Sequence, residues 1–331
     1  MKKGEGRYHR QKLLKEWDQE LIRSSTVLVV GIGALGSVIA LDLALMGIGK
    51  LTLIDNDTVE LSNLNRQILF REDDIGKPKV QAAEEFLEEL NPEVKVNAHM
   101  KDMRSLDKEI YQDSTVIVEG LDTFEARRWL NSMCVHLNKP LVHGGLFGWW
   151  GNVQVIIPHK TPCLECQPLI PKERLQKACT LPGEARKEEE EEKEVFPMIS
   201  TTTTVVGGIQ AQEALKFILK RKDMLDNYLF YDGLSQSFTK IKLVRNPGCV
   251  VCSPKYRSVG VKYVVSLDEP IQELKNRLIM TYGLQDPKII IEGKIVPDDV
   301  RLKDTGVKEG DPIFINDINL ASPIKLIAKI A

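Results

Sequence analysis

The sequence has no apolar run long enough to cross a membrane, and its charged N-terminus lacks the apolar core of a signal peptide. It also has little excess charge, because 45 Lys and Arg residues oppose 47 Asp and Glu residues, a formal net charge of −2. Such a balance gives no reason to expect nucleic acid or an anionic membrane as the main partner. We therefore expect a cytoplasmic protein with no nucleic-acid and no membrane partner.

Cysteine is scarce as well, with six residues among 331. In a cytoplasmic chain, where thiols stay reduced, six cysteines favour metal binding or catalysis over disulfides. The apolar share of 43% supports a real core, and the length suits one large and one small domain.

A glycine-rich turn, GIGALG at residues 31–36, organises the first half of the chain. Residues 27–30 before it are apolar and β-branched, as in a buried parallel strand. Residues 37–46 after it are almost all apolar, as in a buried helix. A strand, a glycine turn and a helix in this order aim backbone N–H groups and a helix N-terminus at a phosphate.

Each glycine of this turn has an expected role. Gly31 allows the tight turn, Gly33 the close approach of a phosphate, and Gly36 the packing of helix on strand. The next predicted strand, residues 51–54, ends at Asp55, near the spacing of an acid that binds a ribose hydroxyl. The pattern predicts a nucleotide site, with a ligand-free turn as the alternative, and does not distinguish a dinucleotide from ATP.

A polar loop at residues 56–67 follows Asp55, at the end of a predicted strand where open α/β sheets bind ligands. Arg66 in this loop could fork onto a phosphate, although a capped surface loop is the alternative. Lys79 lies near the start of a predicted helix, which is unfavourable for a structural cation and suits one that meets an anion.

Asp122 lies just beyond another predicted strand, residues 116–118. A carboxylate at this end of a strand can hold Mg²⁺ on a triphosphate. The alternative is that it caps the following helix, predicted at residues 124–138.

Several further segments carry weaker expectations. We expect His143 to form a structural hydrogen bond rather than act as a base, and residues 144–151 to form a contact loop. Apolar residues between 13 and 22 recur at helical spacing, and a helix is predicted at residues 209–220. From its segment alone, Arg10 belongs to a solvated helix start.

Two CxxC pairs, Cys163 with Cys166 and Cys249 with Cys252, have the spacing at which a tight knuckle presents two thiolates to one metal. Four thiolates suit a closed tetrahedral Zn²⁺ site that clamps distant segments together. The alternative is that one pair is a redox dithiol. The lack of an open coordination position argues against catalytic zinc.

Of the two remaining cysteines, Cys134 falls on an apolar helix face and is expected in the core. Cys179 lies in a turn-rich stretch just before residues 184–194, a glutamate-rich segment that should be solvated and mobile. An accessible thiol there can act as a nucleophile if its pKa is lowered, although an incidental surface cysteine is the alternative.

Residues 5–253 resemble the adenylation domain of ubiquitin-activating enzymes, whose fold is shared by the sulfur-carrier adenylyltransferases. The resemblance rests on RYHRQ, VLVVGIGALGS, LTLIDNDTVELSNLNRQ, GKPK, LDTFEARRWLN, the paired CxxC and VRNPGCVVC. LDTFEARRWLN is closer to the eukaryotic catalytic subunits than to the bacterial enzymes. Ala34 departs from the pattern, since many relatives have glycine there.

Residues 257–331 are predicted to form a strand, a helix and further strands. They are similar to a ubiquitin fold in PIQELKNRLIMTYGL, KIIIEGKIVPDD and LKDTGVKEGDPIFI. The chain ends in AKIA without a diglycine, so this domain resembles the one with which activating enzymes recruit a conjugating enzyme, not a substrate fused in cis. As a whole the chain is similar to a compact archaeal ubiquitin-activating enzyme.

The resemblance implies an α/β, Rossmann-like adenylation domain with a mixed sheet and structural zinc at residues 1–253, including a catalytic-cysteine crossover segment at about 170–200. A small α+β, ubiquitin-like (β-grasp) domain follows at residues 257–331. The implied ligands are ATP, Mg²⁺ and Zn²⁺. The implied nucleotide-site residues are Gly31, Gly33, Ala34, Gly36, Asp55, Asp57, Ser62, Asn63, Leu64, Asn65, Arg66, Gln67, Lys79 and Asp122.

The resemblance also implies roles at matching positions. Asp55 would hold the ribose, Asp122 the Mg²⁺, and Asn63, Arg66 and Lys79 the triphosphate. Arg10 would reach the phosphates of a partner subunit, which implies a homodimer, and Cys179 would be the thioester nucleophile.

The implied reaction is adenylation of the C-terminal glycine of a ubiquitin-like protein that ends in diglycine, followed by a thioester on Cys179 and transfer to a conjugating enzyme. The main alternative is sulfur-carrier activation without an obligatory thioester. A nicotinamide dehydrogenase leaves the SNLNR loop, Lys79 and the zinc unexplained. A non-catalytic scaffold should lack Arg66, Lys79 or Asp122, and all three are present.

Overall fold

The computed structural model describes residues 6–167, 197–256 and 259–331, which divide into two compact units. The described part of the first unit comprises residues 6–122, 137–157 and 197–243. The second unit holds the remaining described residues, 123–136, 158–167, 244–256 and 259–331.

An eight-stranded mixed sheet forms the first unit, with the strand order β3-β2-β1-β4-β5-β6-β7-β8. The first five of these run parallel and the last three are joined antiparallel. The apolar, β-branched stretches expected as strands thus form the centre of the sheet. The strands are β1 (Thr26–Val30), β2 (Lys50–Ile54), β3 (Lys95–His99), β4 (Val116–Glu119), β5 (Leu141–Phe147), β6 (Trp150–Ile156), β7 (Tyr228–Asp232) and β8 (Ser237–Ile241).

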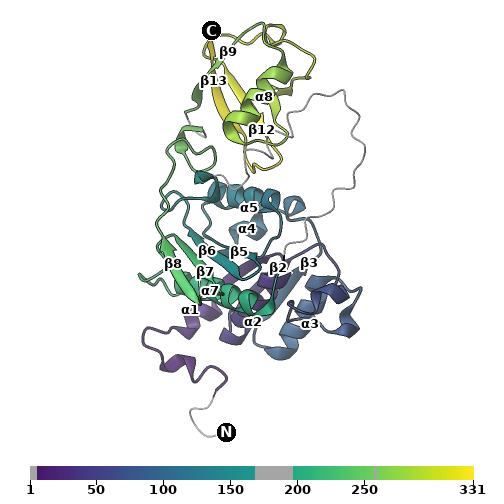
Figure 1. Ribbon diagram of the computed structural model, residues 1–331, viewed down its shortest axis with the longest axis vertical. Coiled ribbons are helices and arrows are strands. Elements are labelled where there is room, and N and C mark those ends of the chain that lie inside the picture. The colour runs from purple at the N-terminus through teal and green to yellow at the C-terminus, as the bar shows by residue number, and fades with distance from the viewer. Residues whose placement is uncertain (1–5, 168–196, 257–258) are drawn as a thin grey trace. The chain divides into compact units, whose positions relative to one another are not determined.

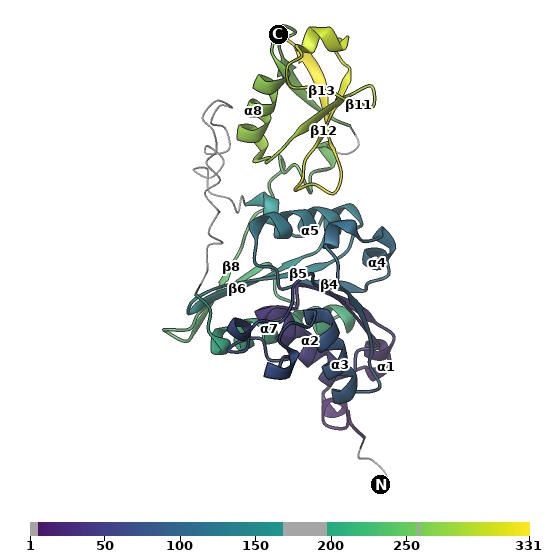
Figure 2. The ribbon, with the colours of Figure 1, turned by 90° about the vertical axis from the view of Figure 1, so that its right-hand side faces the viewer.

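Helices cover both faces of this sheet, with α2, α3 and α7 on one face and α4 on the other (Figure 2). The helices are α1 (Gln19–Arg23), α2 (Ala34–Met46), α3 (Lys79–Leu90), α4 (Lys108–Gln112) and α7 (Ser200–Ile218). Short 3₁₀ helices are η1 (Gln11–Leu13), η2 (Leu61–Asn63), η3 (Glu72–Asp74) and η4 (Met103–Ser105).

Helix α2 is apolar on nearly every side because it packs between the sheet and α7. The two helices come so close that a Cβ on Gly207 of α7 would lie 2.8 Å from the Cβ of Val38. Helix α7 begins at Ser200, nine residues before the predicted start, and so includes Gly207. Gly207 and Gly208 are interior helix positions here, where the missing side chain admits the neighbouring helix.

Two other expectations for this unit were wrong. Residues 13–22 do not form one helix, because the chain is extended at Leu14, Glu16 has a φ of +65°, and Asp18 caps a new helix by accepting from the Leu21 amide. Residues 144–151 are mostly strand, since β5 and β6 pair up to Phe147 opposite Trp150.

The second unit contains α5 (Phe124–His136) and a five-stranded sheet of order β11-β10-β12-β13-β9 (Figure 1). Strands β9 and β13 pair in parallel, and the other neighbours are antiparallel. Helix α8 buries an apolar stripe at positions 271, 274, 278 and 279. The elements are β9 (Val261–Val265), α8 (Ile271–Tyr282), β10 (Lys288–Ile291), β11 (Lys294–Ile295), β12 (Pro312–Asn316), β13 (Ile324–Ile330), η5 (Leu164–Cys166), η6 (Pro254–Tyr256) and η7 (Leu302–Thr305).

Across the described ranges of both units, none of the helices combines the length and the apolar character that a bilayer-spanning segment needs.

Candidate functional site

The glycine turn between β1 and α2 is a place of direct backbone contact. Gly31 has a φ of +85°, and its amide donates to the Ile54 carbonyl at 2.8 Å. A Cβ on Gly36 would lie 1.8 Å from the Gly31 carbonyl oxygen, and a Cβ on Gly31 would lie 2.9 Å from the Gly120 oxygen. Only glycine fits at these positions, so the turn is fixed against the end of β4.

Gly33 is different, because its Cβ position is open. The nearest atom outside its chain neighbours, within the described residues, is Nε2 of Gln67 at 3.8 Å. No side chain or backbone atom of the described residues therefore demands glycine here, while a ligand at the first turn of α2 would. Ala34 follows as the first residue of that helix.

Asp55, directly after β2, is tied to the glycine turn. One carboxylate oxygen accepts from the Ile32 amide at 2.6 Å, and the other accepts from the Asp57 amide at 2.8 Å. Burial raises the pKa of Asp55, and the Asp57 amide and the nearby Lys79 charge oppose that rise. A carboxylate has about four acceptor sites, so Asp55 retains capacity for a ribose hydroxyl.

Lys79, the first residue of α3, is a buried cation at a helix N-terminus. Its Nζ pairs with Asp57 Oδ2 at 3.0 Å, and its amide donates to the Asp57 carbonyl at 3.0 Å. The lysine side chain is 8% exposed and that of Asp57 is 60% exposed. The ammonium thus pairs with an acid at the surface and lies near the Asp55 carboxylate, and its setting beside the N-terminus of α3 suits a further anion.

The polar loop contains buried groups that lack partners. Arg66 donates from Nη1 to the Ser62 carbonyl at 2.8 Å and to Asn65 Oδ1 at 2.9 Å. Its Nε, together with Oε1 of the buried Gln67, has no hydrogen-bond partner among the described residues. Such orphaned groups are unusual in folded proteins and fit a site that a polar ligand completes.

The rest of this loop is shaped by local hydrogen bonds. Asn63 is buried and its Oδ1 accepts from the Glu60 amide at 3.1 Å, while the exposed Ser62 donates to the Glu60 carboxylate at 3.1 Å. Leu64 is half-buried and packs against the core of the unit. These contacts hold the loop at the edge of the sheet where Asp55 lies.

Asp122 is exposed and follows the end of β4 by three residues. Because Gly120 contacts the glycine turn, the structure brings the chain segment of Asp122 to the same edge of the sheet as Asp55. The predicted hydrogen-bonding role of His143 is confirmed, since its Nδ1 bonds to the carboxylate of Glu119. Glu119 itself was not predicted; a glutamate at the end of an apolar strand was the available signal.

Two predicted residues are not joined to this cluster. Arg10 is exposed at the start of η1, and its guanidinium has no hydrogen-bond or ion-pair partner in the part of the chain that the structure describes. Cys179 lies outside the described residues.

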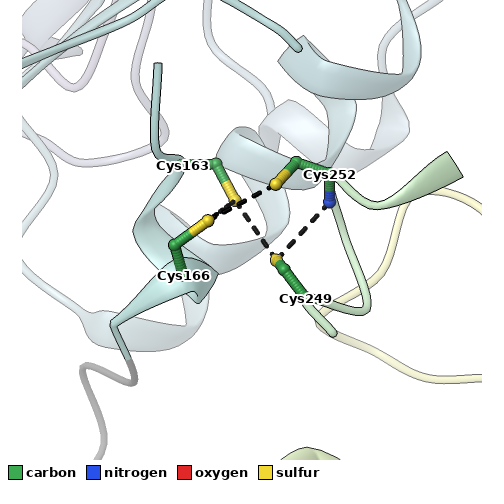
Figure 3. Close-up of side chains that lie close together, drawn as sticks. All are labelled: Cys163, Cys166, Cys249 and Cys252. Carbon is green, nitrogen blue, oxygen red and sulfur yellow. Dashed lines mark hydrogen bonds between the residues drawn. The ribbon is translucent and has the colours of Figure 1, made fainter. Parts of the chain in front are cut away.

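The two CxxC pairs meet in the second unit as a buried cluster of four sulfurs (Figure 3). All four Sγ atoms lie within 4.8 Å of one another, with Cys163 to Cys249 at 3.5 Å and Cys166 to Cys252 at 3.4 Å. A tetrahedral zinc with four bonds of about 2.3 Å has sulfur separations of about 3.8 Å, so the cluster fits this ion. The hydrogen bond with the Cys163 thiol lowers the pKa of Cys252 to about 7, whereas hydrogen bonds within the cluster raise the pKa of Cys163.

Helix α5 anchors the first knuckle within this unit. Arg128 makes a bidentate, buried ion pair with Glu165, at 2.5 and 3.2 Å. Asn131 Oδ1 accepts from the Leu164 amide at 3.1 Å. These bonds fix both residues between Cys163 and Cys166, and so preform half of the metal site.

Comparison with known proteins places these features in context. The model of the ThiF family matches residues 8–251. A SAMP-activating enzyme E1 from Haloferax volcanii is 34% identical over 252 residues, covering 74% of this chain and 88% of that protein. A sulfur carrier protein adenylyltransferase from Thermus thermophilus is 36% identical over 257 residues, covering 74% and 90%.

Two further comparisons are informative. The Nedd8-activating enzyme E1 catalytic subunit of Drosophila melanogaster is 40% identical over 174 residues, covering 48% of this chain and 39% of that protein. Among solved structures, E. coli MccB with ATP superposes with a TM-score of 0.62 at 25% identity, covering 76% of this chain and 75% of MccB.

Proposed function

Because the chain belongs to the ThiF family, we propose that it adenylates the C-terminal glycine of a ubiquitin-like protein that ends in diglycine, using ATP and Mg²⁺. The observation that carries the proposal is the cluster at the sheet edge after β1, β2 and β4. There the glycine turn leaves the Cβ position of Gly33 open, and Asp55 accepts the amide of Ile32 in the same turn. In the polar loop that follows Asp55, the buried Nε of Arg66 has no partner among the described residues. A carrier protein as the substrate is supported by the likeness to a SAMP-activating enzyme E1 at 34% identity and to a sulfur carrier protein adenylyltransferase at 36%.

In this proposal, different residues bind the ribose, the phosphates and the Mg²⁺ of ATP. Asp55 holds the ribose, while Asn63, Arg66 and Lys79 face the phosphates and Asp122 holds the Mg²⁺. A carboxylate is a poor electrophile, and transfer of AMP to it forms a mixed anhydride with loss of pyrophosphate. The enzyme must neutralise phosphate charge and align the carboxylate with the α-phosphate. It needs no general base, since the attacking carboxylate is already ionised.

The proposed second step is a thioester on Cys179. The thiolate attacks the carbonyl carbon of the adenylate, and AMP leaves with the electron pair of the broken C–O bond. Support comes from the 34% identical SAMP-activating enzyme E1 and from the 40% identical Nedd8 E1 catalytic subunit, which are both called E1 enzymes.

The proposed third function belongs to residues 257–331, a ubiquitin-fold domain that recruits a conjugating enzyme. It is supported by the order β9, α8, β10, β11 and β12, which fits the strand, helix and strands expected from the sequence. Strand β13 lies outside the matched motifs and inserts between β9 and β12. The remaining elements of the proposal are a homodimer, a structural zinc on the four cysteines and a cytoplasmic location.

Activation of a sulfur carrier without a thioester is the second candidate. The specific observation in its favour is the similarity to the Thermus thermophilus sulfur carrier protein adenylyltransferase, because the alignment covers 90% of that protein.

The adenylation step is tested by pyrophosphate exchange into ATP in the presence of candidate ubiquitin-like proteins. Asp122→Ala should lower exchange by several hundredfold or more, on the order of 4 kcal/mol, because it removes the Mg²⁺ ligand. The matched control is Asp73→Ala, which removes an exposed acid of η3. Exchange at the wild-type rate by Asp122→Ala would remove this residue from the metal role.

A further inference from the structure

A buried glutamate ends β4 at the edge of the proposed ATP site. Glu119 has no exposed surface, and its Oε1 bonds to Nδ1 of His143, which is itself 4% exposed. Its other oxygen, Oε2, accepts from the Leu121 amide at 2.8 Å. The carboxylate therefore reaches forward along its own chain and holds the peptide that leads into Asp122.

The same stretch is held from a second side by the glycine turn. A Cβ on Gly120 would lie 2.6 Å from the Gly36 amide nitrogen and 3.1 Å from the Gly31 carbonyl oxygen. The backbone at Gly120 thus has no room to move towards α2. Together, this packing and the bond to Leu121 fix the main chain just before Asp122.

These contacts lie just beyond the last paired residues of strands β4 and β5. The registered pairs between β4 and β5 end at Val118 opposite Val142. Beyond them, Glu119 and His143 join the strands through side chains, and Gln210 donates to the carbonyl oxygens of Glu119 at 2.8 Å and Val142 at 3.4 Å. The polar groups of this site replace the missing ladder bonds.

A purely structural role does not require this chemistry. Buried ionisable pairs stabilise a fold no better than apolar residues of similar volume, because desolvation opposes their attraction. An apolar pair could join the strands but could not accept the Leu121 amide. The arrangement is therefore suited to fixing a direction of the chain.

We propose that Glu119 and His143 are positioning residues that hold the Leu121 amide and thereby place the Asp122 carboxylate where it binds the Mg²⁺ of ATP. This inference rests on the proposed function. Glu119 does not touch ATP in this scheme, and its effect passes through the three-residue turn to Asp122. Loss of the pair should weaken Mg²⁺-dependent ATP binding and leave Mg²⁺-independent binding intact.

Isothermal titration of ATP into the full-length protein, with Mg²⁺ and with EDTA, separates these two parts. In the wild type, Mg²⁺ should strengthen ATP binding at least tenfold. Glu119→Gln, which puts an NH₂ group against one of two donors, should lose most of this gain, as should Asp122→Ala. His143→Leu should behave in the same way, whereas His143→Asn keeps a donor for Glu119 and should restore the gain.

Glu213→Gln is the matched control. Glu213 is another buried glutamate that accepts one backbone amide, that of Leu225 at 2.7 Å, and pairs with one side chain, Lys216 at 2.7 Å. It should keep the full Mg²⁺ gain even if its melting temperature falls. An unchanged Mg²⁺ gain in Glu119→Gln, or an equal loss in the Glu213→Gln control, would overturn the inference.

Amide hydrogen exchange of the peptide around Leu121 gives a second reading that does not need ATP. It should become faster in Glu119→Gln and in His143→Leu, and unchanged protection in both would also overturn the inference. A wild-type protein that binds no ATP overturns the proposed function instead, and the exchange data then decide whether Glu119 holds the turn.

Discussion

At the scale of single residues, Asp55 must be ionised for both of its oxygens to accept hydrogen bonds, although its burial favours the protonated carboxyl group. Its carboxylate accepts the amides of Ile32 and Asp57, and burial raises its pKa above the ordinary 3.8. By linkage, a raised carboxyl pKa contributes stability that is complete below pH 3.8 and is lost as the pH rises through the raised value. At neutral pH, the ionised Asp55 that would accept a ribose hydroxyl therefore lowers the folding stability of the protein without nucleotide.

This pKa gives a pH prediction for ATP binding. As the pH falls through the raised pKa, Asp55 gains a proton and loses an acceptor, so ATP affinity should start to fall at a higher pH than an ordinary aspartate would dictate. The measurement is the ATP dissociation constant between about pH 4 and pH 7. Asp55→Asn should bind more weakly at neutral pH and lack this acidic limb; a limb that persists in the variant would belong to another group.

The glycine turn supplies a paired prediction. Gly36→Ala should lower the free energy of unfolding by at least about 3 kcal/mol, because its Cβ would lie 1.8 Å from a carbonyl oxygen. Gly33→Ala has open space and should keep nearly the wild-type melting temperature while binding ATP roughly tenfold more weakly. Calorimetry and ATP titration of both variants check this; a Gly33→Ala protein with full affinity would show that no phosphate approaches this position.

At the scale of elements, periodic segments could be predicted and their interruptions could not. The central strands β1, β2 and β4 and helix α2 follow from the apolar pattern alone, whereas the parts of β5 and β6 within residues 144–151 do not. The start of α7 could not be predicted, because a glycine such as Gly207 normally argues against a helix interior. The close approach of Val38 explains why glycine lies there. The break at Glu16, with its positive φ, is likewise invisible in a pattern of apolar residues.

The candidate site shows the same division. Asp55 and Asp122 were predictable as candidates because Asp55 directly follows an apolar strand and Asp122 follows another within three residues. Glu119 was missed because a strand pattern does not reveal which side chain turns inward to bind a histidine from another strand. A side-chain pairing between distant elements can be recognised only in the folded structure, whereas a residue near a strand end can be recognised from the sequence.

The cysteine cluster leads to a prediction for the two knuckles. Purified protein should carry one zinc per chain, and chelation should lower its melting temperature by roughly 10 °C or more, because the metal links segments 86 residues apart. Metal analysis and thermal melts of Cys249→Ser and Cys252→Ser should show loss of zinc, while Cys134→Ser, in the core of α5, should retain it. Metal-free protein with the same melting temperature would contradict the assignment.

At the scale of the whole molecule, the proposed homodimer would use the exposed Arg10 in the site of the other subunit. If Arg10 completes the site of a two-fold partner, Arg10→Ala and Asp122→Ala should each be inactive alone but should regain activity when mixed. One of the two composite sites in a mixed dimer then has both residues. Pyrophosphate exchange measures the recovery, and its absence despite verified subunit exchange would place Arg10 in its own site or outside any site.

The thioester separates the two leading functions, and Cys179 alone should decide it. Cys179→Ala should keep pyrophosphate exchange, because adenylation uses the residues around the glycine turn, and should lose a thiol-sensitive covalent adduct with the carrier protein. Cys134→Ala is the matched control, since Cys134 is fully buried in α5 and should leave the adduct intact.

Transfer to a conjugating enzyme should also fail in Cys179→Ala, because the enzyme then has no carbonyl thioester to pass on. Deletion of residues 257–331 should impair this transfer while both exchange and the adduct persist, since the proposed recruiting domain acts only after the thioester has formed. Non-reducing gels with labelled carrier, read with and without a thiol, follow the adduct and the transfer in one assay. A Cys179→Ala enzyme that still forms the adduct and supports conjugation would remove the thioester from this residue and make activation of a sulfur carrier the better function.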